Sequence, residues 1–347
     1  MFKVALIGTG FIAVQKHLPA WRRMQNKASV VALCDVDPAR GKEVAQQFGV
    51  PAAYESLSAL LEAERPDIVD ICTPPKTHAA VAIEALRSGA HVMIEKPMAV
   101  SEPECDSILA MAASAGRRVC VAHSDLFYPA FLKARELVRE GAIGEFKGMR
   151  IFLSTPVDYI TSKPDHWAHR LPGGVIGETG PHAVYMTLAF INPIQDVRIH
   201  AQKLLPEFPW SPFEDYRLDL IGEAAVSSVT LTYATRHWGA EVDIWGTDGL
   251  LKLDLESQSL VRYGRNSLEK SEIALSALRE AAQIAGGVLS TGLQFATGKF
   301  ENTHALLIRQ FLESLERGDE PPVTAEEGRE AVRVMNLISE QLQAKVV

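Results

Sequence analysis

Two patterns of apolar residues divide the chain. In the first third, short apolar runs alternate with longer segments in which apolar positions recur every three to four residues. Short buried runs are typical of parallel strands and the longer period is typical of helices, so the alternation predicts β-α-β units around a parallel sheet. The predicted strands are 3–7, 29–33, 52–54, 67–72, 89–94 and 118–122.

From residue 145 the runs instead alternate between apolar and polar positions, as half-buried strands do. The predicted strands are 145–154, 197–205, 217–221, 225–233, 240–246 and 250–255. Turn signals such as Thr247-Asp248-Gly249 separate them, which favours a largely antiparallel sheet. Amphipathic helices predicted over 300–315 and 325–342 close the chain.

Residues 267–299 give no clear prediction. A helix fits 269–283, whereas 285–297 is small, apolar and Gly-rich. Loops of this length are usually functional or mobile. The segment is therefore compatible with a lid, a subunit contact or a long connection.

Composition narrows the class of protein. The chain has 347 residues, enough for two domains, with 47% hydrophobic and 22% charged residues, as in soluble globular proteins. A net charge of −8 argues against a nucleic-acid partner, which calls for a basic face. The four cysteines form no C-x-x-C, which predicts buried thiols in a reducing compartment. With no leader or membrane-spanning pattern, we expect a cytoplasmic protein.

The segment Gly8-Thr9-Gly10-Phe11-Ile12-Ala13 follows the first strand directly and opens a helical pattern. Gly8 allows a tight turn, Gly10 allows a pyrophosphate to approach the backbone, and the helix N-terminus favours the phosphates. Asp35 ends the second strand, where a carboxylate accepts hydrogen bonds from a ribose. Its charge repels a 2′-phosphate, so we expect NAD rather than NADP, with Arg40 as the one nearby residue that opposes this preference.

Two further segments follow later strands, at the edge of the sheet where ligands bind. They are Thr73-Pro74-Pro75-Lys76-Thr77-His78-Ala79 and His91-Val92-Met93-Ile94-Glu95-Lys96-Pro97. Taken alone, Glu95-Lys96-Pro97 is more often an ordinary surface turn. In order with the glycine segment, the three resemble the glucose–fructose oxidoreductase / inositol dehydrogenase / rhizopine-catabolism (Gfo/Idh/MocA) family of nicotinamide-dependent dehydrogenases. The resemblance covers the first third closely and continues more loosely to residue 144.

The pattern and the resemblance together predict an α/β chain with two domains. Residues 1–122 would form a Rossmann domain with a parallel sheet. Residues 123–347 would form an α+β domain for substrate binding and oligomerisation, with a large, mostly antiparallel open sheet, and the last helix would pack back on the first domain. The resemblance implies these cofactor contacts: Gly8, Thr9, Gly10, Phe11, Ile12, Asp35, Thr73, Pro74, His78, Glu95 and Lys96.

One segment of the second domain carries candidate chemistry. A double glycine at 173–174 leads toward Glu178 and His182, and resembles the family's substrate-domain motif, in which an Asp precedes the catalytic His by four residues. Glu178 stands where Asp is usual. If one helix runs through the segment, the two side chains share a face. Alternatively, Pro181 starts a new helix, which weakens the argument from spacing.

Other residues are candidates to line the substrate pocket. Trp167, His123 and His169 are the ones we select, because a loop Trp can form an apolar wall for a sugar ring. The histidines lack a metal-ligand spacing such as H-E-x-x-H, so we expect no metal site.

The implied reaction is hydride transfer between a nicotinamide and a secondary alcohol or ketone of a sugar, cyclitol or sugar derivative. His182 would accept the hydroxyl proton, Lys96 would stabilise the alkoxide, and Glu178 would orient His182 or bind a neighbouring hydroxyl. The expected partner is a small polyhydroxylated molecule rather than nucleic acid or membrane, with the chain as a homodimer or homotetramer. Two alternatives are an NAD-dependent glycoside hydrolase on the same fold and a non-catalytic NAD(H)-binding regulator.

Overall fold

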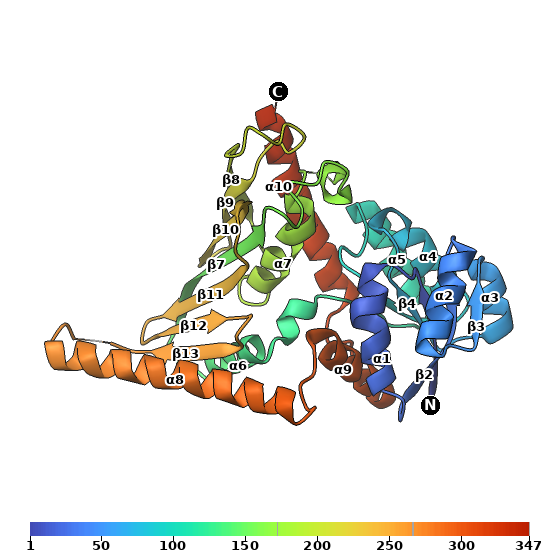
Figure 1. Cartoon of the computed structure of the whole chain (residues 1–347), viewed down its shortest axis with the longest axis horizontal. Helices are drawn as coiled ribbons and strands as arrows, with labels where there is room; N and C mark the ends of the chain where they lie inside the picture. The colour runs from blue at the N-terminus through green and yellow to red at the C-terminus, as the bar shows by residue number, and fades with distance from the viewer. Residues whose placement is uncertain (172, 266, 347) are drawn as a thin grey trace. The chain divides into compact units, whose positions relative to one another are not determined.

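A computed structural model describes residues 1–171, 173–265 and 267–346. The chain divides into two units, which are described separately (Figure 1). Unit 1 comprises Met1–Phe127 and Glu301–Arg333, and unit 2 comprises Tyr128–Phe300 and Val334–Val347. The helix α10 (Ala325–Val346) therefore contributes residues to both units.

Unit 1 is built on a six-stranded sheet in the order β3-β2-β1-β4-β5-β6, with every neighbouring pair parallel. The strands are β1 (Phe2–Ile7), β2 (Ala28–Cys34), β3 (Ala52–Tyr54), β4 (Ile68–Ile71), β5 (His91–Ile94) and β6 (Val119–Val121). The central strands are apolar and buried because helices cover both faces of such a sheet. The predicted parallel sheet is confirmed.

The connections of unit 1 are helical. They are α1 (Leu18–Arg23), α2 (Pro38–Phe48), α3 (Leu57–Glu64), α4 (Pro75–Arg87) and α5 (Glu102–Ala115), followed by the 3-10 turn η2 (Ser124–Phe127) and, after unit 2, by α9 (Thr303–Arg317). Local capping explains several starts: Asp37 caps α2, Ser56 caps α3 and Ser101 caps α5 through their side-chain oxygens. One π turn, η1 (Ala13–His17), precedes α1.

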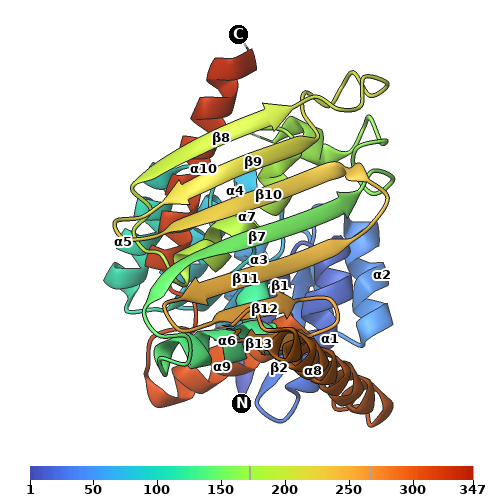
Figure 2. The same ribbon diagram turned by 90° about the vertical axis from the view of Figure 1, so that its left-hand side faces the viewer.

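Unit 2 is built on a seven-stranded sheet in the order β13-β12-β11-β7-β10-β9-β8, seen face-on in Figure 2. The strands are β7 (Phe146–Pro156), β8 (Asp196–Gln202), β9 (Asp215–Ile221), β10 (Val226–Thr235), β11 (Gly239–Gly246), β12 (Leu250–Asp254) and β13 (Ser259–Tyr263). All neighbours are antiparallel except β7 and β10, which are parallel. The predicted mostly antiparallel sheet is confirmed, and β13 is a strand that the pattern did not predict.

Besides its part of α10, unit 2 contains the helices α6 (Pro129–Arg139), α7 (Ile176–Leu188) and α8 (Lys270–Ala296) and the 3-10 turn η3 (Trp167–Arg170). α7 packs against β7, β9 and β10, and α6 packs against β12 and β13. The segment that gave no clear prediction is a single helix of 27 residues, α8, which runs along β13. Among the described residues, no helix is both long enough and apolar enough to span a membrane.

Candidate functional site

The turn between β1 and the first helix has the geometry of a phosphate cradle. Gly8 has φ of +88°, and a Cβ there would lie 2.8 Å from the Cys72 carbonyl oxygen, so this position requires glycine. A Cβ on Gly10 would meet nothing within 4 Å, which leaves open space above the backbone. Helical structure begins at Phe11, so the N-terminus of a helix faces the same turn. The arrangement fits the pyrophosphate of a dinucleotide.

Asp35 lies directly after β2 and is tied to this turn. Its Oδ2 accepts hydrogen bonds from the Thr9 backbone N–H at 2.7 Å and from the Thr9 hydroxyl at 2.6 Å, and its Oδ1 accepts from the Asp37 N–H at 2.9 Å. Burial raises the pKa of Asp35, but these hydrogen bonds outweigh it, and the net pKa is lowered. A carboxylate therefore stands at the carboxyl end of β2, where a ribose is expected.

Arg40, the cation that could offset this charge, has a partner of its own. Its Nη1 lies 2.9 Å from the Glu43 Oε2 in the first turns of α2. Both side chains are exposed, so the pair contributes little to stability. The Glu43 carboxylate does, however, reduce the net positive charge beside Asp35.

His78 connects the loops that follow β4 and β5. Its Nε2 lies 2.7 Å from the Thr73 carbonyl oxygen and its Nδ1 lies 2.8 Å from the Pro97 carbonyl oxygen. The ring is fully buried, and burial lowers its pKa despite the two carbonyls. The neutral ring carries one N–H and donates to one carbonyl at a time. Of the predicted cofactor residues, Thr73 is half-buried and Pro74 is exposed, whereas His78 lies beneath both loops.

Glu95 follows β5 and is the end of a buried polar network. Its Oε1 lies 2.8 Å from the His17 Nε2 and 3.4 Å from the His304 Nε2, and its Oε2 accepts from the Lys96 backbone N–H at 3.1 Å. On the other side of the ring, the His17 Nδ1 lies 2.8 Å from the Asp70 Oδ2. The Trp21 Nε1–H donates to the same Asp70 oxygen at 2.6 Å.

The charges in this network follow from the geometry. Burial lowers the pKa of His17, but Asp70 outweighs it, and the net pKa is raised well above the usual value. Burial raises the pKa of Glu95, but hydrogen bonds from His17 and His304 outweigh it, and the net pKa is lowered well below the usual value. His17 is therefore an imidazolium whose two N–H groups each donate to a carboxylate. Separations of 2.8 Å are those of N–H···O bonds.

Sequence reasoning did not find His17, Asp70, His304 or Trp21. Two signals were available: Asp70 is a charged residue inside an otherwise apolar strand, and His17 is a polar residue on the buried side of its helix. The π turn ends at His17, and such turns are frequent at functional sites. Lys96 follows this fixed carboxylate and is half-buried.

In unit 2, α7 carries the second group of candidates. The helix is continuous through Pro181, so Glu178 and His182 lie one turn apart on the same helix. The Tyr185 hydroxyl lies 2.6 Å from the His182 Nδ1, and the Thr179 hydroxyl donates to the Glu178 Oε2 at 2.9 Å. Tyr185, which the sequence did not single out, thus holds the ring of His182 by one nitrogen. If Nδ1–H donates to the phenol oxygen, Nε2 is the atom that can accept a proton.

The predicted substrate residues are divided between the units. Trp167 and His169 lie in η3, which packs against α7, and Trp167 is 51% exposed. The His169 Nε2 lies 3.1 Å from the Lys163 carbonyl oxygen, which holds the ring toward its own loop. His123 belongs to unit 1 and is buried.

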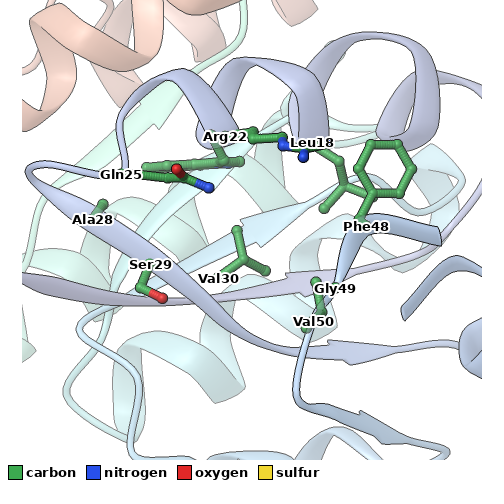
Figure 3. Close-up of a pocket in the computed structure, with 10 residues that line it drawn as sticks. Leu18, Arg22, Gln25, Ala28, Ser29, Val30, Phe48, Gly49 and Val50 are labelled. Carbon is green, nitrogen blue, oxygen red and sulfur yellow. The ribbon is translucent and has the colours of Figure 1, made fainter. Parts of the chain in front are cut away.

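A small cavity of about 110 Å³ in unit 1 lies apart from these residues (Figure 3). Residues of α1, the start of β2 and the end of α2 line it, including Leu18, Val30 and Phe48. It therefore adjoins the end of β2 opposite to Asp35.

The fold and the first group of residues define a dinucleotide-binding α/β protein. Comparison with protein families then gives the family. Residues 2–123 match the Gfo/Idh/MocA oxidoreductase family model, described as an NAD-binding Rossmann fold, and residues 131–252 match the C-terminal domain of the same family. The chain belongs to this oxidoreductase family, and its first domain matches the family's NAD-binding Rossmann fold.

Some of the curated relatives are named as sugar dehydrogenases. D-apiose dehydrogenase of Paraburkholderia graminis is 33% identical over 163 residues, which cover 47% of this chain and 43% of that protein. D-apiose dehydrogenase of Rhizobium rhizogenes is 26% identical over 81% of both chains. The first match therefore spans less than half of the relative's length.

Solved structures resemble the whole chain. An oxidoreductase domain protein from Kribbella flavida has a TM-score of 0.80 at 23% identity, over 100% of this chain and 98% of its own. A WlbA dehydrogenase from Bordetella pertussis, solved with NADH and UDP-GlcNAcA, has a TM-score of 0.80 at 19% identity, over 99% of this chain and 96% of its own. At these identities the likeness establishes the fold.

Proposed function

We propose that the protein transfers hydride between NAD and a secondary alcohol or ketone of a sugar, cyclitol or sugar derivative. The observation that carries the proposal is the position of Lys96. It follows a carboxylate fixed by His17 and His304, at the carboxyl edge of the sheet that also holds the glycine turn. Relatives named as dehydrogenases of apiose and of a D-glucoside support a polyhydroxylated substrate.

Each residue has a proposed part in the reaction. The cofactor accepts or supplies the hydride when it is bound. The Lys96 ammonium donates a hydrogen bond to the substrate oxygen and stabilises negative charge as it develops. His182 takes the hydroxyl proton, with Tyr185 fixing its ring, and Glu178 contacts a neighbouring hydroxyl or orients His182.

We propose NAD as the preferred cofactor. The Asp35 carboxylate accepts ribose hydroxyl hydrogen bonds and repels a 2′-phosphate, and the Glu43 carboxylate beside Arg40 adds a further negative charge. We further propose a cytoplasmic enzyme that acts on a small molecule.

The test is a screen of cyclitols, aldoses, sugar phosphates and nucleotide sugars for NAD⁺ reduction at 340 nm, with an aryl-glycoside panel beside it. We expect NADH formation with at least one polyol and none with Lys96→Ala, whose turnover should fall at least ~100-fold while NADH affinity stays within a few-fold. A Lys96→Ala variant that loses NADH affinity and turnover equally would make Lys96 a cofactor residue. Aryl release without net NADH would instead identify a glycoside hydrolase.

A further inference from the structure

His78 lies in the first turns of α4, at the carboxyl edge of the parallel sheet, yet its side chain is 0% exposed. Both ring nitrogens face backbone carbonyl oxygens at hydrogen-bond distance, Nε2 toward Thr73 at 2.7 Å and Nδ1 toward Pro97 at 2.8 Å. A ring that is engaged on both sides by the backbone has no nitrogen left for a cofactor. Any effect of His78 on the site therefore passes through the two loops that it contacts.

The first of these loops, which follows β4, supports the glycine turn. A Cβ on Gly8 would lie 2.8 Å from the Cys72 carbonyl oxygen and 2.9 Å from the Thr73 backbone nitrogen. The glycine turn thus packs directly on the residue whose carbonyl oxygen faces the His78 Nε2. Because interiors are close-packed, a shift of this loop would also move the turn that fits the pyrophosphate. The contact to Thr73 is therefore a support for cofactor binding.

The second loop, which follows β5, carries Lys96 between two anchored residues. On one side, the Glu95 carboxylate lies 2.8 Å from the His17 Nε2. On the other side, the Pro97 carbonyl oxygen lies 2.8 Å from the His78 Nδ1. An ammonium that stabilises charge in a transition state must be held in place, because a small displacement lowers the rate strongly. His78 therefore anchors one of the two residues that determine where the Lys96 backbone lies.

We propose that His78 is a positioning residue for both halves of the reaction. Through the Thr73 carbonyl it fixes the glycine turn for the cofactor, and through the Pro97 carbonyl it fixes Lys96 for hydride transfer. The second half rests on the function proposed above for Lys96, whereas the first half concerns cofactor binding alone. This role differs from the one that the family resemblance implies, in which His78 itself contacts the cofactor.

Two amide substitutions separate the contacts. The side-chain nitrogen of Asn is as many bonds from Cα as the histidine Nδ1, and that of Gln is as many bonds from Cα as Nε2. Both amide nitrogens are hydrogen-bond donors. His78→Asn therefore keeps a donor for the Pro97 carbonyl and loses the one for Thr73, and His78→Gln does the reverse. Each variant leaves one buried carbonyl without its donor, so the general cost of substitution is similar and the difference between the variants reports the two contacts.

The first test compares the dissociation constant of NADH, by fluorescence titration, with kcat for a polyol that the screen identifies. His78→Asn should raise the NADH dissociation constant about three- to tenfold, the equivalent of one hydrogen bond, and leave kcat within about twofold. His78→Gln should lower kcat about three- to tenfold and leave the NADH dissociation constant within about twofold. Equal changes of both quantities in both variants would overturn the proposal, because a structural residue or a direct cofactor contact does not separate them.

His91→Asn is the matched control. His91 begins β5 at the end opposite to the Lys96 turn, and its Nδ1 accepts a hydrogen bond from the Arg118 backbone N–H at 3.0 Å. The Asn side-chain oxygen can accept the same bond. This variant should change neither kcat nor the NADH dissociation constant. A split between the two quantities in His91→Asn as well would show that the split does not report the contacts of His78, and would overturn the proposal.

The second test needs no substrate. Hydrogen exchange followed by mass spectrometry measures how often the segment 95–98 opens, because the Lys96 backbone N–H donates to the Glu95 carboxylate in the closed turn. Exchange in this segment should be faster in His78→Gln than in the wild type and unchanged in His78→Asn. Unchanged exchange in His78→Gln would overturn the proposal. If the screen finds no turnover, the function proposed for Lys96 fails, whereas the exchange and the NADH titration still decide the role of His78.

Circular dichroism checks that each variant folds. If one of them does not, ¹⁵N NMR of labelled histidine in the wild type decides, because a protonated ring nitrogen and one with a free lone pair differ in chemical shift. Holding both loops requires a proton on each nitrogen of His78 for part of the time. A ring that is protonated at one nitrogen alone would leave one carbonyl without a donor, and would overturn the proposal.

Discussion

Replacing His17 with Leu should destabilise unit 1 more than a typical buried substitution. The imidazolium is fully buried and makes two charged hydrogen bonds of 2.8 Å, to Asp70 at 0% exposure and to Glu95 at 7%. Leu fills much of the volume but leaves both carboxylates without their shared cation. Removing one partner of a buried ion pair lowers the free energy of unfolding by about 3–5 kcal/mol. That is a large share of the ~5–15 kcal/mol by which a folded domain is favoured over the unfolded chain.

The same substitution should change how stability depends on pH. The pKa of His17 is raised on folding, so its contribution is fully present below pH 6.5 and is lost as pH rises toward the folded pKa. Over that window the free energy of unfolding should fall by up to about 1.4 kcal/mol per pH unit in the wild type. The pKa of Glu95 is lowered, so its contribution is present above pH 4.5. His17→Leu should lose the slope above pH 6.5.

Urea unfolding followed by ¹⁹F NMR of fluorotryptophan measures both effects. Trp21 is the only one of the five tryptophans in unit 1, and it donates to Asp70, so its signal reports this unit. Trp21→Phe identifies the resonance. The double variant His17→Leu/Asp70→Asn is the matched control. It should recover part of the free energy of unfolding that His17→Leu loses, because the side chain at position 70 is then uncharged and needs no cation. A loss below ~1 kcal/mol for His17→Leu, with an unchanged slope above pH 6.5, would refute the charged network.

Four further substitutions test the rest of the site. Asp35→Ser should narrow the preference for NAD over NADP, measured as the ratio of kcat/KM values, and an unchanged ratio would reject the ribose assignment. Tyr185→Phe removes the 2.6 Å contact to His182 and should lower kcat by up to about tenfold, the equivalent of one hydrogen bond, whereas an unaltered kcat would show that the contact is dispensable. Gly8→Ala should cost about 1–3 kcal/mol of stability by thermal unfolding, because of its φ and the Cys72 carbonyl. Gly10→Ala should instead weaken NADH binding with little effect on stability. If Gly8→Ala and Gly10→Ala lowered stability and NADH affinity equally, the assignment of this turn to the pyrophosphate would be contradicted.

The alternation of elements in unit 1 could be predicted because each strand is a short apolar run bounded by polar residues or glycine. The glycine turn was also predictable, since Gly8 must adopt a positive φ that other residues avoid. Local pattern was sufficient wherever the cause of the structure was itself local.

The buried network was not predictable in the same way. The network joins residues that are far apart in sequence, namely His17, Asp70, Glu95 and His304. No local pattern indicates that these side chains contact one another. The pattern of 285–297 suggested a break in the helix, yet α8 runs through its glycines. Gly287 fits there because it allows close contact with Ser259. These are tertiary contacts between separate elements, so they form only once the strands have been brought together.

Asp35 has a consequence for anyone who wishes to change the cofactor. The carboxylate that we assign to the ribose is also the acceptor for the Thr9 backbone N–H and hydroxyl in the glycine turn. A redesign toward NADP that replaces Asp35 with a side chain lacking an oxygen at this place therefore also removes a support of the glycine turn. Under this assignment, cofactor preference and the geometry of the glycine turn depend on the same side chain. A replacement that lacks an acceptor then needs a second substitution that gives Thr9 a new one.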